Sequence, residues 1–314
     1  MSYFTKLLKP LLLETRLGGM LLIPYRLWLA LGYLAPQLKR SVKWAFSSRE
    51  LTNVTYDITA DNCEYLAHTI SAVTRVPYSV AMSYLCEVQN EYEIVRHTLN
   101  CIERSTMRFC CDRSCRLGRR IGWYAFVRIL KPRIVVETGV DKGHGAVVLC
   151  AALMRNEAEG FPGRYYGTDI NPEAGFLLSE PYSRVGKILY GDSVETLRSF
   201  SEIDIFINDS DHSAEYERLE YDTIAPKLRE GRGLILGDNC HSTDVLARFS
   251  AETKRQFVFF REQPKDHWYP GGGIGISFVS SARHGMAGTD DRDSQADSTP
   301  DDVICHALIN QCLR

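Results

Sequence analysis

The stretch Arg133–Gly145, RIVVETGVDKGHG, decides the fold of this chain. It begins with a short run of β-branched residues, which is typical of a strand buried in a parallel sheet. It ends with glycines at 139, 143 and 145, which allow a tight turn and a close approach of the backbone to a ligand. The apolar segment 145–158 follows and predicts a helix. A strand that runs through a glycine turn into a helix indicates an α/β fold.

Strands and helices continue to alternate after this unit. The spacing predicts an open, doubly wound, mostly parallel sheet of seven strands, preceded by an N-terminal helical extension. In such a sheet, ligands bind at the carboxyl ends of the strands. The further strands are expected at RYYGTDI (164–170), before GDS (191–193), and at IDIFINDS (203–210), GLILGDN (233–239), FVFFREQ (257–263) and GIGISFV (273–279), with a helix over 213–228.

Composition divides the chain into four predicted regions. Residues 1–48 form a basic, apolar arm, residues 49–118 a helical cap with apolar residues three and four apart, and residues 119–280 the sheet domain. Residues 281–314 form an acidic tail, with six aspartates in residues 281–302, and we expect it to be flexible.

The N-terminal arm carries seven Lys and Arg residues against Glu14 alone. Its apolar run is interrupted at Arg26, and the uncharged pieces, 17–25 and 27–38, are shorter than the ~20 residues that cross a membrane. We favour an arm folded onto its own domain. Peripheral contact with a membrane and packing against another subunit in a homo-oligomer are the alternatives.

Overall composition is ordinary for a globular protein, with 45% hydrophobic and 24% charged residues. The net charge of −2 argues against a nucleic-acid partner. The ten cysteines do not form a dense framework, so we expect reduced thiols in a cytoplasmic protein, at the inner membrane surface if the arm binds lipid.

Polar residues follow the first three predicted strands. Glu137 stands two positions before Gly139, where it would repel a pyrophosphate but would suit a cationic amino-acid group. Asp169 ends the second strand and can accept the hydroxyls of a ribose. Asp192 and Ser193 follow the third strand, near the expected adenine. The pattern predicts a nucleoside ligand without a pyrophosphate.

A second group of polar residues follows the fourth and fifth strands. Asp209 ends one strand, and Asp238 and Asn239 end the other. If these strands are neighbours, two carboxylates and an amide converge, which is an oxygen ligand set suited to Mg²⁺ or another divalent cation. His212 lies three residues after Asp209, where an imidazole can accept a proton near neutral pH.

These motifs resemble the class I S-adenosylmethionine-dependent methyltransferases over about residues 120–280, through ETGVDKGHG, YYGTDI and GDS in order. The Asp209 and Asp238-Asn239 pattern resembles the metal-dependent O-methyltransferases, and DSDHSAEYERLEYD is similar to the macrocin-type sugar O-methyltransferases. The resemblance implies S-adenosyl-L-methionine as cofactor, with His212 as the general base. It also implies cofactor contacts at Glu137, Gly139, Gly143, Gly145, Asp169, Asp192 and Ser193.

We therefore expect a divalent-metal-assisted O-methyltransferase that acts on a hydroxyl of a small molecule, a sugar or glycosylated metabolite. One alternative is a nicotinamide-dependent oxidoreductase of the Rossmann type. The other is a catalytically silent scaffold that keeps the fold and uses the basic arm to bind a membrane or a partner.

Overall fold

The computed structural model describes residues 15–51, 54–238 and 240–279. They fall into two compact units. One contains the N-terminal residues up to Ser48 together with Asp266–Tyr269, and the other contains Arg49–Lys265 and the residues from Pro270 onward. The predicted acidic tail and Asn239 lie outside the described residues.

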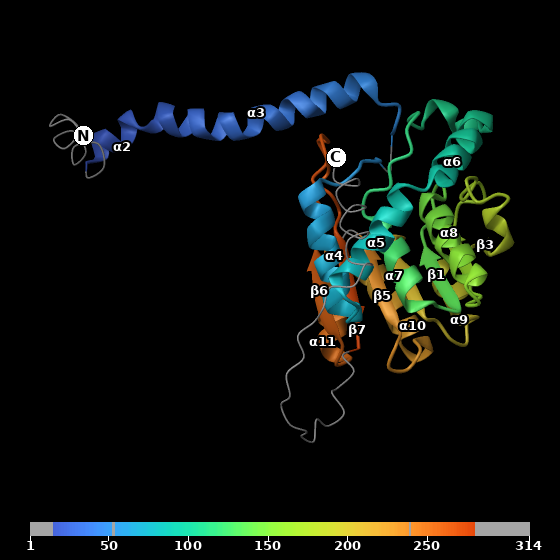
Figure 1. The fold of residues 1–314 in the computed structure, drawn as a ribbon. Helices are drawn as coiled ribbons and strands as arrows, with labels where there is room; N and C mark the ends of the chain where they lie inside the picture. Colours follow the sequence, from blue (N-terminus) through green and yellow to red (C-terminus); the bar gives the residue numbers. More distant parts are fainter. Residues whose placement is uncertain (1–14, 52–53, 239, 280–314) are drawn as a thin grey trace, which may run out of the picture. The chain divides into compact units, whose positions relative to one another are not determined.

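The second unit is built on one seven-stranded sheet in the order β3-β2-β1-β4-β5-β7-β6 (Figure 1). The first five strands in this order are parallel, β7 is antiparallel to β5, and β6 is antiparallel to β7. The predicted doubly wound, mostly parallel sheet is confirmed. The strands are β1 (Ile134–Thr138), β2 (Arg164–Asp169), β3 (Gly186–Tyr190), β4 (Ile205–Asn208), β5 (Leu234–Asp238), β6 (Gln256–Phe260) and β7 (Ile274–Phe278).

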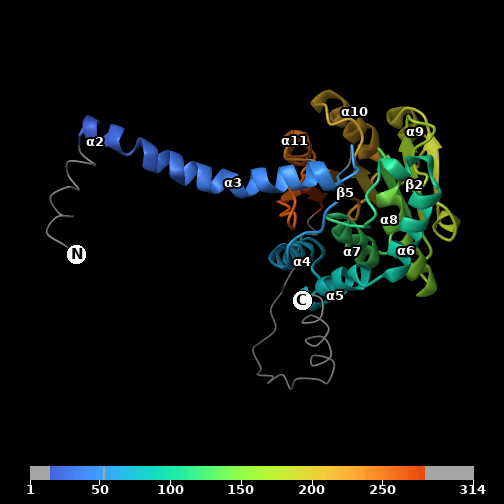
Figure 2. The same cartoon turned by 90° about the horizontal axis from the view of Figure 1, so that it is seen from above.

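Helices cover both faces of the sheet, so that the view from above shows three layers (Figure 2). One face packs against α4, α5, α7 and α8, with α6 against α8, and the other against α9, α10 and α11. The helices are α4 (Ala60–Thr74), α5 (Tyr78–Gln89), α6 (Tyr92–Arg104), α7 (Arg120–Leu130), α8 (His144–Ala158), α9 (Ser193–Arg198), α10 (Ala214–Ile224) and α11 (Val245–Glu252). Short 3-10 turns lie at Thr106–Phe109, Tyr182–Arg184 and Ala225–Lys227.

Local sequence explains where several helices begin. Thr59 precedes α4, and its hydroxyl accepts a hydrogen bond from the amide of Asn62. Asp192 precedes α9 and accepts one from the amide of Glu195. Both are preferred N-cap residues, because their side chains satisfy an amide that the helix leaves without a partner. The caps fix the points at which the chain turns away from the sheet edge.

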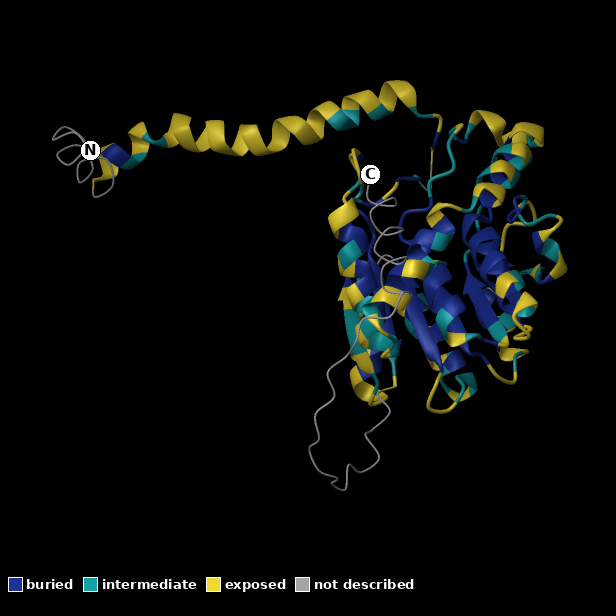
Figure 3. Cartoon of the chain, in the orientation of Figure 1, coloured by how far each residue is buried: buried dark blue, intermediate teal, exposed yellow. Residues whose placement is uncertain are grey.

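The first unit consists mainly of two helices, α2 (Arg16–Leu21) and α3 (Ile23–Ser47). No residue of α3 is buried, and Figure 3 shows it as exposed along most of its length. Near its end, the Trp44 ring packs on that of Trp268, with centroids 5.2 Å apart.

Candidate active site

The fourth and fifth strands of the chain are neighbours, as the sequence predicts. Their register pairs Asn208 with Gly237, so the next residues, Asp209 and Asp238, leave the sheet at the same edge. His212 follows in the turn before α10. The ligating atoms of Asp209, His212 and Asp238 all lie within 4.8 Å of one another. Three predicted site residues are thus brought together, and Asn239 lies outside the described residues.

Gly139 makes this approach of the strand ends feasible. Its φ is +79°, and a Cβ placed there would lie 1.8 Å from the backbone oxygen of Asp209. The amide of Asp209 also donates to the carbonyl oxygen of Thr138, at 2.9 Å. The glycine turn therefore holds the loop after β4 against the end of β1, and no side chain can be accommodated at position 139.

His212 lies between two carboxylates. Its Nε2 is 3.7 Å from Asp209 Oδ1, and its Nδ1 is 3.6 Å from Glu217 Oε1. Glu217 is fully buried and also accepts a hydrogen bond from Thr243, at 2.6 Å. The nearby Glu217 carboxylate raises the pKa of His212 above the ordinary value of 6.5, although burial opposes the shift. Glu217 thus orients the imidazole and strengthens it as a base.

The sequence analysis did not identify Glu217. A signal was present, because Glu217 lies about one turn into the helix that begins directly after His212. An acidic residue at that position faces back toward the strand end from which the helix starts.

Asp238 is held by Arg119, which precedes α7 and is buried. The guanidinium contacts both carboxylate oxygens of Asp238, and its Nη1 is 3.8 Å from Glu262. Burial acts to raise the pKa of Asp238, but the charge of Arg119 and a hydrogen bond with Asp209 outweigh it, so the pKa is lowered. Burial and the neighbouring Asp238 charge raise the pKa of Asp209 well above its usual value.

The donor set fits a divalent cation. The charges of Arg119 and Arg120 act on Asp209 and Asp238, and Arg119 also faces Glu262. The pKa of Asp209 is still raised, first by its burial and then by the neighbouring Asp238 charge. A cation beside Asp209 and Asp238 would remove the repulsion between them, and carboxylate oxygens are the ligands that Mg²⁺ prefers.

A cavity of about 610 Å³ opens at the same edge of the sheet. This volume lies in the usual range for a small-molecule site. Five aspartates line it, at 141, 169, 192, 209 and 211, and none of its described lining residues is Lys or Arg. The cavity is therefore suited to a positively charged ligand rather than a phosphate. The predicted site residues that line it are Gly139, Asp169, Asp192, Ser193, Asp209 and His212.

Asp169 and Asp192 are anchored by local hydrogen bonds. One oxygen of Asp169 accepts from the amides of Val140 and Asp141, at 3.0 and 2.9 Å, and thereby fixes the glycine turn. Asp192 accepts from the Tyr216 hydroxyl at 2.8 Å, and its pKa is lowered, first by the backbone hydrogen bond at the start of α9. Both aspartates line the cavity.

Glu137, Gly143 and Gly145 do not line the cavity. Glu137 is 1% exposed and accepts a hydrogen bond from the Tyr165 hydroxyl. A Cβ at position 145 would lie 2.1 Å from Glu137 Oε1, so Gly145 lets α8 pack directly over this carboxyl group. Burial raises the pKa of Glu137 to about 7. Gly143, at φ +98°, forms the left-handed N-cap of α8.

Glu137→Gln is expected to change how stability depends on pH. In the wild type, the pKa of this carboxyl is near its ordinary value of 4.5 in the unfolded state and about 7 in the folded state, so its contribution to stability falls as pH rises between these values. The glutamine side chain does not titrate and can still accept from Tyr165. Thermal unfolding should show the variant gaining stability relative to wild type from pH 4.5 to 8. A constant difference across that range would contradict the raised pKa.

Glu220 is a second buried carboxylate that the sequence analysis missed. It accepts hydrogen bonds from the side chains of Thr138, Ser193, Asn208 and Ser210. These residues come from the ends of β1 and β4 and from the start of α9. Glu220 on α10 therefore ties these three parts of the chain together.

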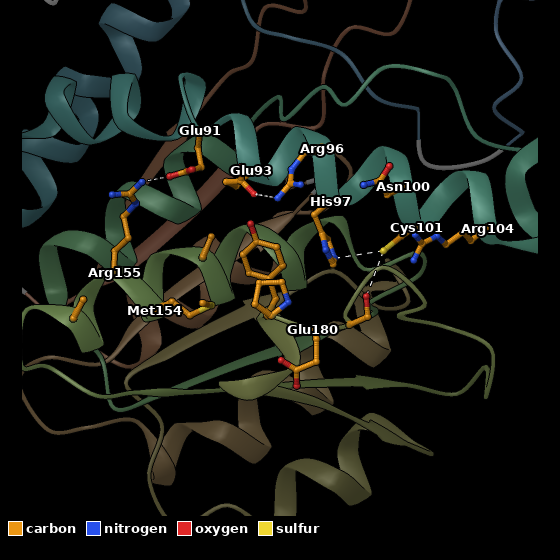
Figure 4. Close-up of a pocket in the computed structure, with 15 residues that line it drawn as sticks. Glu91, Glu93, Arg96, His97, Asn100, Cys101, Arg104, Met154, Arg155 and Glu180 are labelled. Carbon is orange, nitrogen blue, oxygen red and sulfur yellow. Dashed lines mark hydrogen bonds and ion pairs between the residues drawn. The ribbon is translucent and has the colours of Figure 1, made fainter.

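A separate cavity of about 550 Å³ lies between α6, α8 and the loop before Tyr182 (Figure 4). His97 and Cys101 on α6 lie at its wall, and Cys101 Sγ is 3.5 Å from His97 Nε2. Arg96 and Arg155 are paired with Glu93 and Glu91. This second cavity shares no lining residue with the cavity of about 610 Å³ at the sheet edge, and none of the predicted site residues line the second cavity.

Part of the sequence matches a known protein family. Residues 136–240 match the family described as methyltransferase domain. No curated protein matches the chain.

Solved structures are similar at low identity. One is an S-adenosylhomocysteine-bound methyltransferase from Podospora anserina, at 16% identity and a TM-score of 0.44, covering 60% of this chain and 88% of that one. Another, described as a caffeoyl-CoA O-methyltransferase from Staphylococcus aureus, has 13% identity and a TM-score of 0.43, covering 62% and 95%. A third, described as an O-methyltransferase from Klebsiella pneumoniae, has 15% identity and a TM-score of 0.43, covering 60% and 90%.

Proposed function

We propose that this S-adenosylmethionine-dependent methyltransferase transfers its methyl group to a hydroxyl oxygen of a small molecule, a sugar or glycosylated metabolite. The observation that carries the proposal is the acidic cavity at the strand ends, with His212 in its wall. A neutral hydroxyl is a poor nucleophile, so an acceptor of this kind needs a base at the site of transfer. His212, oriented by Glu217, is that base.

The cavity is suited to the cofactor through its charge. S-adenosylmethionine supplies a methyl group on a positively charged sulfur. Asp169 and Asp192 hold the nucleoside part, and the turn that begins at Gly139 gives close access to the backbone. The five lining aspartates favour a cationic ligand and repel the pyrophosphate of a nicotinamide dinucleotide, which disfavours the oxidoreductase alternative.

His212 and Glu217 carry out the transfer of the proton from the acceptor hydroxyl. As the acceptor oxygen bonds to the methyl carbon and the carbon–sulfur bond breaks, His212 Nε2 takes the hydroxyl proton. The carboxylate of Glu217 beside Nδ1 stabilises the imidazolium that results. S-adenosylhomocysteine and the methyl ether are the products.

Asp209 and Asp238 would hold the divalent cation, together with Asn239 if the predicted ligand set is complete. A bound Mg²⁺ supplies a Lewis acid that lowers the pKa of a coordinated hydroxyl. Arg119 keeps Asp238 ionised and in position for this role. The polar lining of the cavity, including Asn171, Ser210 and Tyr216, supports a hydroxylated acceptor.

Titration of the purified chain with S-adenosylhomocysteine and with NADH tests the cofactor. The homocysteine compound at 100 times its Kd is expected to stabilise the folded protein by about 2.7 kcal/mol, measured as a rise in Tm. NADH should have no effect. Stabilisation by NADH alone would favour the oxidoreductase, and binding of the cofactor product without turnover of any hydroxyl acceptor would favour the silent scaffold.

Mg²⁺ titration by calorimetry tests the metal site. Asp209→Asn is expected to weaken Mg²⁺ binding by about tenfold or more, because it removes a charged ligand. Asp211→Asn is the matched control, since Asp211 also lines the cavity but lies outside the Asp209–His212–Asp238 cluster. Equal affinities in both variants and wild type, or full activity in excess chelator, would contradict metal assistance.

A further inference from the structure

The N-terminal helix α3 carries a stripe of exposed apolar side chains. Six side chains recur at intervals of three or four residues, which places them on one face of the helix. Each is between 48% and 67% exposed. The stripe consists of Ile23, Leu27, Leu31, Leu34, Leu38 and Val42.

The charges of α3 lie on the other side of the helix. At 100° per residue, the mean direction of the four basic residues of α3 is opposite to that of the stripe. The sequence from Thr15 to Arg49 contains no Asp or Glu. The helix is therefore amphipathic and purely cationic, with basic residues Arg26, Lys39, Arg40 and Lys43.

We propose that α3 binds the surface of an anionic lipid bilayer, with the apolar stripe in the outer part of the acyl chains and the basic residues among the headgroups. An amphipathic helix with a basic polar face binds in this way through buried apolar area and attraction to anionic lipids. In a cell, it would hold the methyltransferase at the inner membrane surface, whose anionic lipids attract such segments.

A bilayer fits α3 better than a second copy of the chain. Tyr25, Trp28, Leu29 and Tyr33 lie outside the stripe and are also at least 49% exposed. A partner helix covers one narrow face, whereas at a bilayer the aromatic rings of Tyr25, Trp28 and Tyr33 can lie at the level of the headgroups. Two copies packed along the stripe would leave these four side chains exposed.

A position along the surface fits α3 better than a membrane crossing. Residues 16–47 are long enough to span a membrane, and an 18-residue window within them has a mean hydropathy of 1.3. Arg26, however, lies near the middle of the apolar run 17–38. In a crossing helix it would reach the bilayer centre, where a charged side chain is costly. A helix lying along the surface keeps it among the headgroups.

Co-sedimentation of the full chain with vesicles tests the proposal. Binding to phosphatidylcholine vesicles containing phosphatidylglycerol is expected, with weaker binding to pure phosphatidylcholine. Leu34→Glu should reduce binding by about tenfold or more, because it removes a buried apolar side chain and adds a charge. Gln37→Glu is the matched control: it adds the same charge three residues away, outside the stripe, and should reduce binding by no more than about twofold.

Three results would overturn the proposal. One is the absence of binding to anionic vesicles. If sedimentation analysis then shows a dimer that Leu34→Glu dissociates, the stripe binds a second copy of the chain instead. The second is an equal loss of binding in the two glutamate variants. The third is resistance to extraction with alkaline carbonate, which indicates a crossing helix. Unchanged stabilisation by S-adenosylhomocysteine in both variants should show that the catalytic unit is intact.

Discussion

His212→Ala is expected to lower kcat by about 10²–10⁴-fold, because the acceptor hydroxyl loses the base that takes its proton. Binding of S-adenosylhomocysteine, measured by calorimetry, should change little, since the imidazole acts on the acceptor rather than on the nucleoside. Retention of kcat within about twofold of wild type would show that His212 is not the base.

Glu217→Gln separates orientation from proton transfer at the same site. The wild-type pKa of His212 is raised, so its neutral, active form accumulates only as pH rises above 6.5. Without the Glu217 charge, the pKa should fall, and the acidic limb of the kcat–pH profile should move to lower pH while the maximal rate declines. An unchanged limb would mean that Glu217 does not control the imidazole.

Gly139→Ala is expected to have the largest effect on folding. The new Cβ would overlap the backbone oxygen of Asp209, and backbone cannot move aside as a flexible side chain can. Thermal or denaturant unfolding should show that the free energy of unfolding falls by at least about 3 kcal/mol, or that no folded protein is obtained.

Gly160→Ala is the matched control for Gly139→Ala. Gly160 also has a positive φ, at +88°, but a Cβ there meets no atom within 4 Å. Gly160→Ala should therefore lose only the stability that a left-handed conformation costs a non-glycine residue, about 1–2 kcal/mol. Equal losses in the two variants would mean that the close approach at Asp209 does not restrict position 139.

Much of the fold could be predicted because its signals are local. The β-branched run of β1, the glycine turn after it and the alternation of strands with helices each arise within a short segment. Strand ends in a parallel sheet share one edge, so the meeting of Asp209 with Asp238 also followed from the sequence once the two strands were taken as neighbours.

Residues that reach the site from distant elements could not be predicted in this way. Arg119 meets Asp238 across 119 positions of sequence. Glu262 accepts hydrogen bonds from Arg119 and Tyr56, which come from two other parts of the chain. Such pairs depend on how α7 packs on the sheet and on the position of β6 within it. The residue periodicity of these two segments does not indicate either arrangement.

The sequence by itself determined the order of the elements and the acidic, oxygen-rich character of the strand ends, because residue type and spacing carry that information along the chain. Only the tertiary structure decided that Glu137 lies buried beneath α8 and that Arg119 and Glu217 hold Asp238 and His212. Burial and charge pairing are properties of what packs around a group, and that surrounding comes from elements far apart in the chain.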